Sequence, residues 1–197
     1  TGLITPAMAA EDDVPETYSN AYVVMDAKTG QVLLQKNMYE KEYPASITKI
    51  LTTALGLTYA KPEDRITVSQ ETVSNVWKWG ETTHLALEPG EIITLKDALY
   101  GAMVESANDC ANAIAQAVSG SLTDFAELMN QQVAALGLSD THFTNAHGLP
   151  DKDHYTTAYD MARITRWAMT VPGFEEYFCA TEYTIPVSYT HLTLPTS

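Results

Sequence analysis

The sequence predicts an α+β fold, in which strands and helices occupy separate stretches of the chain. Strand-like runs open the chain at 21–25 and 32–37, and helix-period runs fill its middle from 94 to 170. One more strand candidate, 182–186, follows the last helical run. No internal repeat and no alternation of strand and helix is visible, so a βαβ array is not expected.

The first two runs are expected to form a β-hairpin. Residues 21–25 are β-branched and aromatic, 32–37 begin with an apolar run, and an Asp/Gly turn separates them. Pro44 then breaks the chain, and the apolar spacing of 46–60 predicts a helix.

The stretch from 65 to 95 is mixed, and helices follow it. Strand candidates lie at 65–69 and 83–87, and a Glu-Pro-Gly turn at 88–90 follows the second. Four helices are then expected, at 94–106, 107–118, 121–137 and 157–170.

The composition is that of a globular protein with an acidic surface. Apolar residues make up 45 % of the 197 residues and charged residues 18 %, with a formal net charge of −14. This charge repels phosphate backbones, so nucleic-acid binding is not expected, and no basic cluster could hold an anionic membrane. The two cysteines, Cys110 and Cys179, have no metal-type spacing and are predicted to be buried apolar side chains.

The start of the chain carries a candidate export signal. The segment 7–9 (Ala-Met-Ala) has the small-x-small form of a signal-peptidase site, and an acidic run follows at 11–13. A signal-peptide remnant predicts an extracytoplasmic protein, and a disordered Ala-rich terminus is the alternative. No later stretch approaches the ~20 apolar residues of a membrane span.

Ser46 and Lys49 form the first candidate catalytic pair. Residues three apart lie on one face of a helix, so the Lys49 amine could take the proton of the Ser46 hydroxyl. Burial would favour the neutral amine that a base requires. The alternative is structural: Ser46 caps the helix and Lys49 is a solvated helix residue, in a spacing that chance alone could supply.

Ser106-Ala107-Asn108 supplies the second candidate set, in a segment that joins two predicted helices. A second hydroxyl can relay a proton between a base and a leaving group, and an amide can hold both a lysine and a substrate carbonyl. S-x-N is also common by chance, so it is the order, the spacing and the flanking segments of the two motifs that make the pair persuasive.

With both motifs the chain resembles a known family. S-x-x-K followed by S-x-N is typical of class A β-lactamases and penicillin-binding proteins. The flanking segments resemble the D-alanyl-D-alanine carboxypeptidases, the low-molecular-mass penicillin-binding proteins, over 21–186. These segments are "DAKTGQVL", "PASITKI", "PGEIITLKDALYGAMVESANDCANAIA", "FAELMNQQVAALGL", "THFTNAHGLPDKDHYTTAYDMARI" and "VPGF". The resemblance implies a β-lactamase/transpeptidase-like fold, an antiparallel sheet flanked by helices with a helical subdomain.

The resemblance also implies a role for each matching residue. Ser46 would attack the terminal D-Ala-D-Ala bond of peptidoglycan stem peptides, with Lys49 as the general base. Ser106 would relay the proton to the departing D-alanine, and Asn108 would orient Lys49 and the substrate amide. Water would release the acyl-enzyme, β-lactam antibiotics would leave Ser46 stably acylated, and neither a metal nor a cofactor is implied.

Other functions are less compatible with these motifs. A class A-like β-lactamase is disfavoured by S-A-N in place of S-D-N and by the lack of an E-x-x-L-N deacylation loop. A non-catalytic module that binds peptidoglycan or a partner would be free to lose the four motif residues. His147 and His154 suit a structural loop better than a zinc site, because they lie seven residues apart with no third ligand.

The third motif of the family, K-T-G after S-x-N, is expected beyond this chain. Lys28-Thr29-Gly30 precedes Ser46 and lies in the first hairpin turn, where Gly30 supplies a positive φ. We therefore expect a chain truncated at both ends, without its C-terminal sheet strands and acylated poorly or not at all. A membrane anchor in a C-terminal segment would also lie beyond it. The expected parts are a signal-peptide remnant with an N-terminal extension (1–20), a partial catalytic domain (21–186) and a charge-free, non-native tail (187–197).

Overall fold

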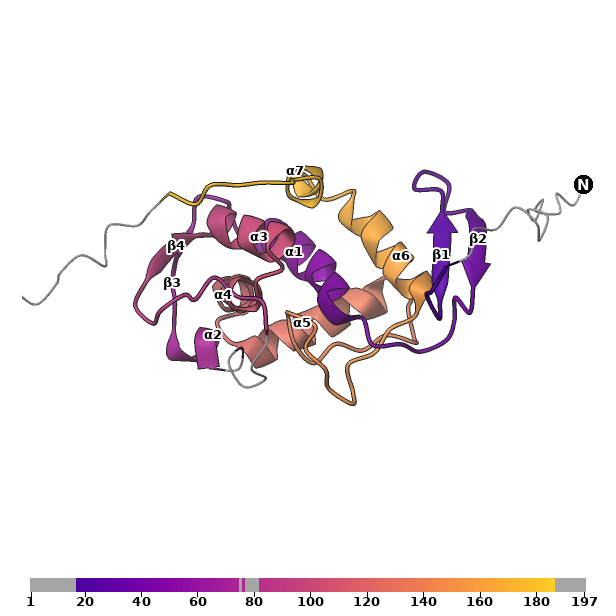
Figure 1. Ribbon diagram of the computed structural model, residues 1–197, viewed down its shortest axis with the longest axis horizontal. Coiled ribbons are helices and arrows are strands. Elements are labelled where there is room, and N and C mark those ends of the chain that lie inside the picture. Colours follow the sequence, from indigo (N-terminus) through magenta and orange to yellow (C-terminus); the bar gives the residue numbers. More distant parts are fainter. Residues whose placement is uncertain (1–16, 75, 77–81, 187–197) are drawn as a thin grey trace, which may run out of the picture.

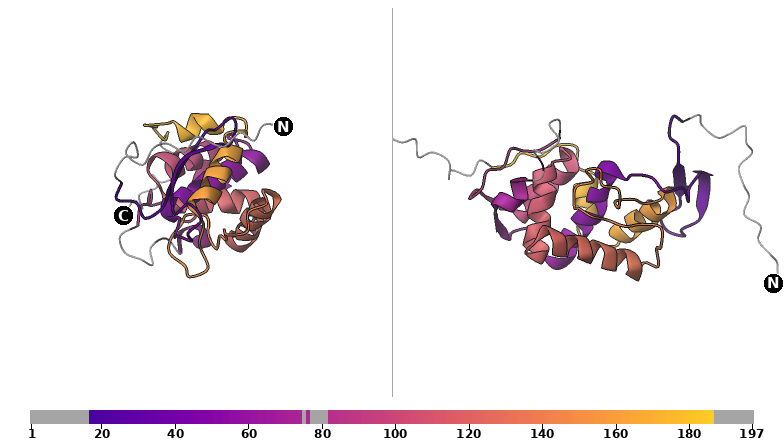
Figure 2. Two further views of the ribbon diagram at one scale, coloured as in Figure 1. Left: turned by 90° about the vertical axis from the view of Figure 1, so that its right-hand side faces the viewer. Right: turned by 90° about the horizontal axis from the view of Figure 1, so that it is seen from below.

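Two short antiparallel ribbons lie at opposite ends of the molecule, and helices fill the space between them (Figure 1). The right-hand view in Figure 2 shows the same arrangement from below. This computed structural model describes residues 17–74, 76 and 82–186. The candidate signal-peptidase site and the 187–197 tail lie outside the described residues. The predicted α+β class is confirmed.

The N-terminal ribbon forms as the sequence predicts. β1 (Tyr22–Met25) pairs with β2 (Val32–Lys36) in an antiparallel hairpin. Asp26 closes the turn, because its carboxylate accepts hydrogen bonds from the backbone N–H and the hydroxyl of Thr29, each at 2.7 Å. Gly30 has the positive φ, +75°, that was expected of it.

The predicted helices are present with shifted ends. The helix expected at 46–60 begins as a 3-10 turn, Ala45–Ile47, and continues as α1 (Thr48–Tyr59). Two five-residue helices were not predicted, because so short a run shows little periodicity. The remaining helices are α2 (Gln70–Ser74), α3 (Leu95–Val104), α4 (Asn108–Ser119), α5 (Leu122–Ala135), α6 (Ala158–Ala168) and α7 (Phe174–Phe178).

One predicted strand, 83–87, is wrong. β3 (Arg65–Thr67) instead pairs antiparallel with β4 (Ile92–Thr94), which follows the predicted turn. The backbone of 83–87 bends at Ala86, which has a φ of +58°. Two of its N–H groups donate to the buried carboxylate of Asp109 at 3.0–3.1 Å. A side-chain acceptor thus takes the place of a neighbouring strand.

The predicted strand at 182–186 is also not formed among the described residues. This segment lies along α3 and is fixed there by side chains. The ring of Tyr183 stacks on that of Tyr100, with centroids 3.8 Å apart, and its hydroxyl donates to Asp97 at 2.9 Å. Aromatic packing and one polar contact, not a β-ladder, therefore hold the segment.

Helix α1 lies at the centre of the core and contacts α3, α4, α5, α6 and α7. Leu51 and Leu55 on this helix are fully buried. Gly56 allows α4 to approach closely, since a Cβ at this position would lie 2.9 Å from the Ile114 side chain. The first turn of α1, which carries Lys49, is thereby anchored in a well-packed interior.

The two cysteines lie in different environments. Cys110 in α4 is fully buried, as predicted, and burial raises the pKa of its thiol well above the usual value. Cys179 is exposed, so the prediction that it is buried is wrong. It caps the end of the short helix α7, where the chain lies at the surface.

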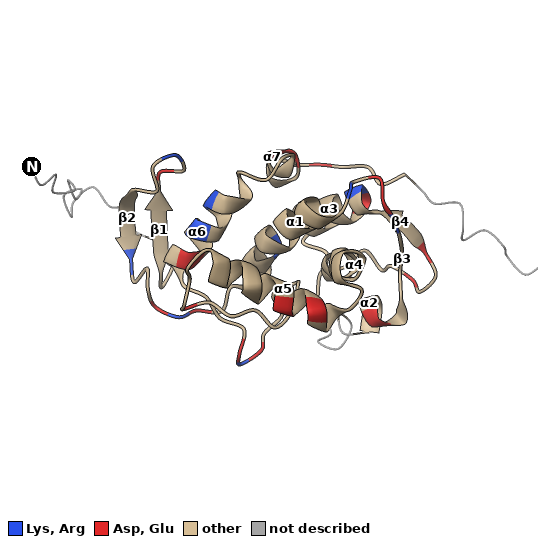
Figure 3. Ribbon diagram, turned by 180° about the vertical axis from the view of Figure 1, so that it is seen from behind, with Lys and Arg blue, Asp and Glu red and all other residues tan. Residues whose placement is uncertain are grey.

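Acidic residues occur on α2, α5, α7 and at the β3–β4 end of the molecule, among other places (Figure 3). Within the described ranges, no helix combines the length and the apolar character needed to cross a membrane.

Candidate active site

Ser46 lies in the 3-10 turn that leads into α1, and it is exposed. It does not cap a helix, because the cap positions of the turn and of α1 are Pro44 and Ile47 and neither makes a side-chain cap bond. The preceding residue, Ala45, has a φ of +49°. Such a conformation costs a non-glycine residue about 1–3 kcal/mol and is often found at active sites. The helix-cap alternative for Ser46 is therefore wrong.

Lys49 lies one turn further on and is almost completely buried, with 2 % of its surface exposed. Its Nζ donates to Asn108 Oδ1 at 2.8 Å and to the His147 carbonyl oxygen at 2.9 Å. Two longer contacts reach hydroxyl groups, Ser106 Oγ at 3.3 Å and Ser46 Oγ at 3.5 Å. Lys49 thus joins the two sequence motifs, and the alternative of a solvated lysine is wrong.

Ser106 and Asn108 lie at the junction of α3 and α4. Ser106 has a φ of +57°, so its backbone is also in the left-handed region. The backbone N–H of Asn108 donates to the Thr83 carbonyl at 2.9 Å, which fixes the start of α4. The hydroxyl of Ser106 and the amide oxygen of Asn108 both contact Lys49 Nζ from this junction.

The environment of Lys49 suits a base. Burial lowers the pKa of Lys49 to about 8, and the neighbouring Cys110 and Asp109 oppose part of this effect. At pH 7, a pKa near 8 leaves about a tenth of the amine neutral, against less than ~0.1 % for an unperturbed lysine. A neutral Lys49 amine can accept the proton of the Ser46 hydroxyl.

A fourth partner of Lys49, the His147 carbonyl, comes from the loop between α5 and α6. Asn145 Oδ1 accepts hydrogen bonds from the backbone N–H groups of His147 at 3.2 Å and Gly148 at 2.7 Å. Gly148 has a φ of +92°, and a Cβ there would overlap the Ala45 carbonyl. Sequence reasoning missed this contact, because a backbone carbonyl has no residue-type signal.

The two histidines of this loop have structural contacts. His154 Nδ1 accepts the backbone N–H of Thr144 at 3.0 Å, which leaves Nε2 to donate to Thr48 Oγ1 at 2.9 Å. Burial lowers the pKa of His154 to about 4 and that of His147 to about 3, so both are neutral at pH 7. In the part of the chain that the structure describes, no group of three His, Cys, Asp or Glu side chains could hold a metal ion.

The candidate residues meet at a cavity of about 250 Å³. Ser46, Ser106 and Asn108 line it, and Lys49 lies buried behind them. A hydroxyl nucleophile, an amine base, a second hydroxyl and an amide therefore converge on one space, which is the set of groups that serine acyl transfer requires. The other lining residues are Tyr43, Ala45, Thr82, Thr83, His147, Gly148, Leu149 and Pro150.

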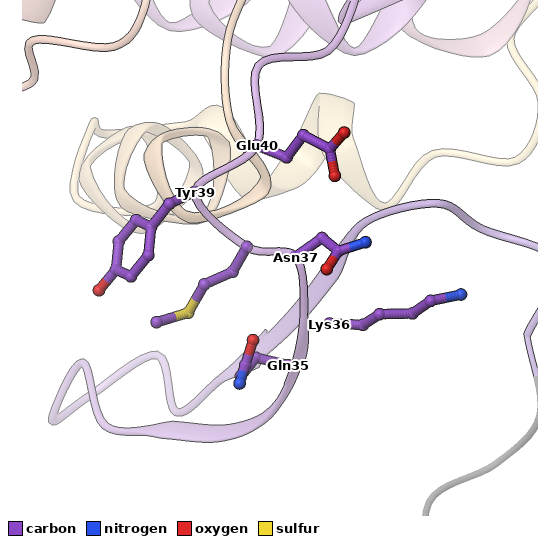
Figure 4. Close-up of a pocket in the computed structure, with 6 residues that line it drawn as sticks. Gln35, Lys36, Asn37, Tyr39 and Glu40 are labelled. Carbon is purple, nitrogen blue, oxygen red and sulfur yellow. The ribbon is translucent and has the colours of Figure 1, made fainter.

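Another hollow, of about 510 Å³, lies beside β2 and is lined by the six consecutive residues 35–40. Figure 4 shows its labelled side chains pointing in different directions instead of converging on a centre. A surface loop of one continuous segment explains this hollow without a functional role.

Lys28-Thr29-Gly30 lies away from the cavity, as predicted. It forms the turn at one end of the β1–β2 ribbon, whereas the segment that leads to Ser46 leaves from the other end (Figure 1). Arg166 of α6 donates to the Lys28 carbonyl at 2.9 Å, which ties the turn to a helix. These three residues are therefore part of a structural turn.

Comparison with known proteins shows which family the chain belongs to. The family model for D-alanyl-D-alanine carboxypeptidase, peptidase family S11, matches residues 7–195. D-alanyl-D-alanine carboxypeptidase DacF of Bacillus subtilis is 36 % identical over 171 residues, which cover 82 % of this chain and 43 % of that protein. D-alanyl-D-alanine carboxypeptidase DacC of Escherichia coli is 36 % identical over 170 residues, which cover 80 % of this chain and 42 % of that protein. This chain thus spans about half the length of the curated relatives it matches.

Solved structures are similar as well. Penicillin binding protein 6B from Escherichia coli aligns with a TM-score of 0.82 at 28 % identity, covering 91 % of this chain and 58 % of that one. Penicillin binding protein 5 from Haemophilus influenzae aligns with a TM-score of 0.79 at 29 % identity, covering 87 % of this chain and 51 % of that one. The predicted fold is confirmed, and the chain belongs to the family of serine-type D-alanyl-D-alanine carboxypeptidases.

Proposed function

We propose that the protein removes the terminal D-alanine from peptidoglycan stem peptides through an acyl-enzyme on Ser46. The observation that carries the proposal is the position of Lys49 Nζ, which lies within 3.5 Å of Ser46 Oγ and 3.3 Å of Ser106 Oγ. Its contacts with Asn108 and His147 hold the amine in place, and its lowered pKa suits it to take up and return a proton.

In the acylation step, Ser46 Oγ attacks the carbonyl carbon of the D-Ala-D-Ala bond while its proton passes to Lys49. The carbonyl oxygen becomes an oxyanion, which backbone N–H groups beside Ser46 would stabilise. When the intermediate collapses, the C–N bond breaks and the proton returns through Ser106 to the amine of the departing D-alanine. The product is an ester between Ser46 and the shortened peptide.

In the deacylation step, water adds to the ester carbonyl and gives up a proton to the base. The bond between the acyl carbon and Ser46 Oγ then breaks, and the serine hydroxyl is restored. A β-lactam would react with Ser46 in the same way, but its leaving group stays tethered to the acyl chain. The penicilloyl ester is therefore expected to persist, which makes penicillins both inhibitors and probes of the site.

The whole protein's setting is also part of the proposal. Peptidoglycan lies outside the cytoplasmic membrane, so we infer an extracytoplasmic location that follows from export. Because its Lys-Thr-Gly lies in a hairpin turn away from the cavity, we expect the 197-residue polypeptide to be acylated poorly or not at all.

The direct test is peptide turnover by the complete gene product. A synthetic peptide that ends in D-Ala-D-Ala should release free D-alanine, and Ser46→Ala should abolish the release. Ser121→Ala is the matched control, since Ser121 caps α5 and lies outside the cavity. Release that persists in Ser46→Ala would contradict the proposal, and penicillin binding without any release would favour a non-catalytic binding module.

A further inference from the structure

Asp109 is a buried carboxylate that the steps described above do not use. It follows Asn108 in the first turn of α4 and is fully buried. Its oxygens accept the backbone N–H groups of Leu85 at 3.0 and 3.1 Å, Leu87 at 3.0 Å and Cys110 at 2.9 Å. A buried carboxylate is costly unless its oxygens accept hydrogen bonds, and these amides supply them.

The segment that Asp109 holds forms a wall of the catalytic cavity. Thr82 and Thr83 line the cavity, and the Thr83 carbonyl accepts the backbone N–H of Asn108. Two consecutive residues of α4 therefore hold this segment: Asn108 binds Thr83, and Asp109 binds Leu85 and Leu87. Ala86 bends the backbone with a φ of +58°, which brings the N–H groups on either side of it to one carboxylate. Such a conformation persists only where surrounding contacts compensate its cost.

The same carboxylate acts on the base by its charge. The negative charge of Asp109 raises the pKa of Lys49 and so opposes the effect of burial. Among the described residues, two other titratable groups act on or are acted on by Lys49: burial raises the pKa of the Cys110 thiol and lowers the pKa of His147 to about 3. A change at Asp109 should therefore alter both the cavity wall and the titration of Lys49.

We propose that Asp109 is a positioning residue, which clamps residues 82–87 against α4 so that Thr82 and Thr83 form the wall for the substrate peptide. The inference rests on the proposed function. Loosening the clamp should weaken substrate binding more than the chemical step, because Lys49 keeps its contact with the His147 carbonyl, which comes from the loop between α5 and α6.

Two variants separate the clamp from the charge. Asp109→Asn removes the charge and directs an NH₂ group toward backbone N–H donors, whereas Asp109→Glu keeps the charge but displaces the acceptor. Asp124→Asn is the matched control, since Asp124 is an exposed acidic residue in the first turn of α5. In the complete gene product we expect both Asp109 variants to raise KM about tenfold with kcat within about threefold. The acid limb of the pH profile should move to lower pH in Asp109→Asn alone.

Hydrogen exchange tests the clamp without using activity. The amides of Leu85 and Leu87 should be protected in the wild-type protein, although they lie outside any sheet, and should lose protection in both Asp109 variants. Unprotected amides in the wild type would overturn the inference even if the variants do not fold. A fall in kcat with unchanged KM would also overturn it, as would an unmoved acid limb in Asp109→Asn. If Ser46 proves not to be the nucleophile, the proposed function fails. Hydrogen exchange at Leu85 and Leu87 would still show whether Asp109 holds residues 82–87 against α4.

Discussion

The rate at which penicillin acylates Ser46 should follow the deprotonation of Lys49 as the pH is raised from 6 to 9. Burial sets the pKa of Lys49 at about 8. The nearby His147 and His154 have pKa values lowered to about 3 and about 4, so their charge does not change in this range. The acid limb of the profile should therefore report Lys49.

The size of the effect follows from the fraction of neutral amine. With a pKa near 8, this fraction is about 1 % at pH 6, about 10 % at pH 7 and about 50 % at pH 8. We therefore expect the rate constant to rise roughly 50-fold from pH 6 to pH 8 and only about twofold more above it. An unperturbed lysine would instead give a tenfold rise per pH unit throughout, without a plateau below pH 9.

The assay is the second-order rate constant for labelling the complete gene product with a fluorescent penicillin, measured by quenching at fixed times. Lys49→Arg is the control, because its guanidinium stays charged at every pH tested. It should be labelled about 10²–10⁴-fold more slowly at all pH values. A flat profile between pH 6 and 8, or a rise that continues tenfold per unit to pH 9.5, would refute the assignment of Lys49 as the base.

Three further predictions concern the residues around Ser46 and Lys49. Gly148→Ala should lower the melting temperature and slow acylation, because its Cβ would overlap the Ala45 carbonyl at a φ of +92°; an unchanged melting temperature would count against this packing. Asn108→Ala should slow acylation about 10–100-fold by removing the 2.8 Å partner of Lys49, whereas Asn112→Ala, which loses only a bond to the Thr72 carbonyl, should be labelled at the normal rate. In the unfolded chain His154 takes up a proton below about pH 6.5, whereas in the folded protein its pKa is lowered to about 4. The free energy of unfolding, measured with urea, should therefore fall as the pH falls from about 6.5 to about 4. His154→Gln should reduce that dependence without abolishing it, because His147, whose pKa is lowered to about 3, contributes with the same sign; an equally steep fall in the variant would contradict the assignment.

Local patterns predicted much of the fold from the sequence. The hairpin of β1 and β2 depends on residue types and a turn within a short segment, and α3 to α6 each show a helical period. The strand predicted at 83–87 failed because its hydrogen-bond partner is Asp109, a side chain that lies more than 20 residues away in the sequence. No local pattern distinguishes a segment that pairs with a strand from one that pairs with a carboxylate.

The candidate site was likewise predicted only in part: the sequence indicated its side chains but not its backbone contributions. Ser46, Lys49, Ser106 and Asn108 were found because their side chains carry the chemistry and their spacing matches a motif. The His147 carbonyl was missed, since its contribution comes from backbone geometry that Asn145 and Gly148 fix. The strained φ values of Ala45 and Ser106 were likewise invisible, because any residue type can carry them when tertiary contacts compensate.

If Ser46 is the nucleophile of an acyl-transfer site, a penicillin must become bound to it. Mass spectrometry of the complete gene product after brief exposure to benzylpenicillin can detect this adduct. We expect a gain equal to one penicillin molecule, mapped by peptide fragmentation to Ser46 and absent from Ser46→Ala. An adduct on Ser106 or another residue, or no adduct in a folded protein, would contradict it.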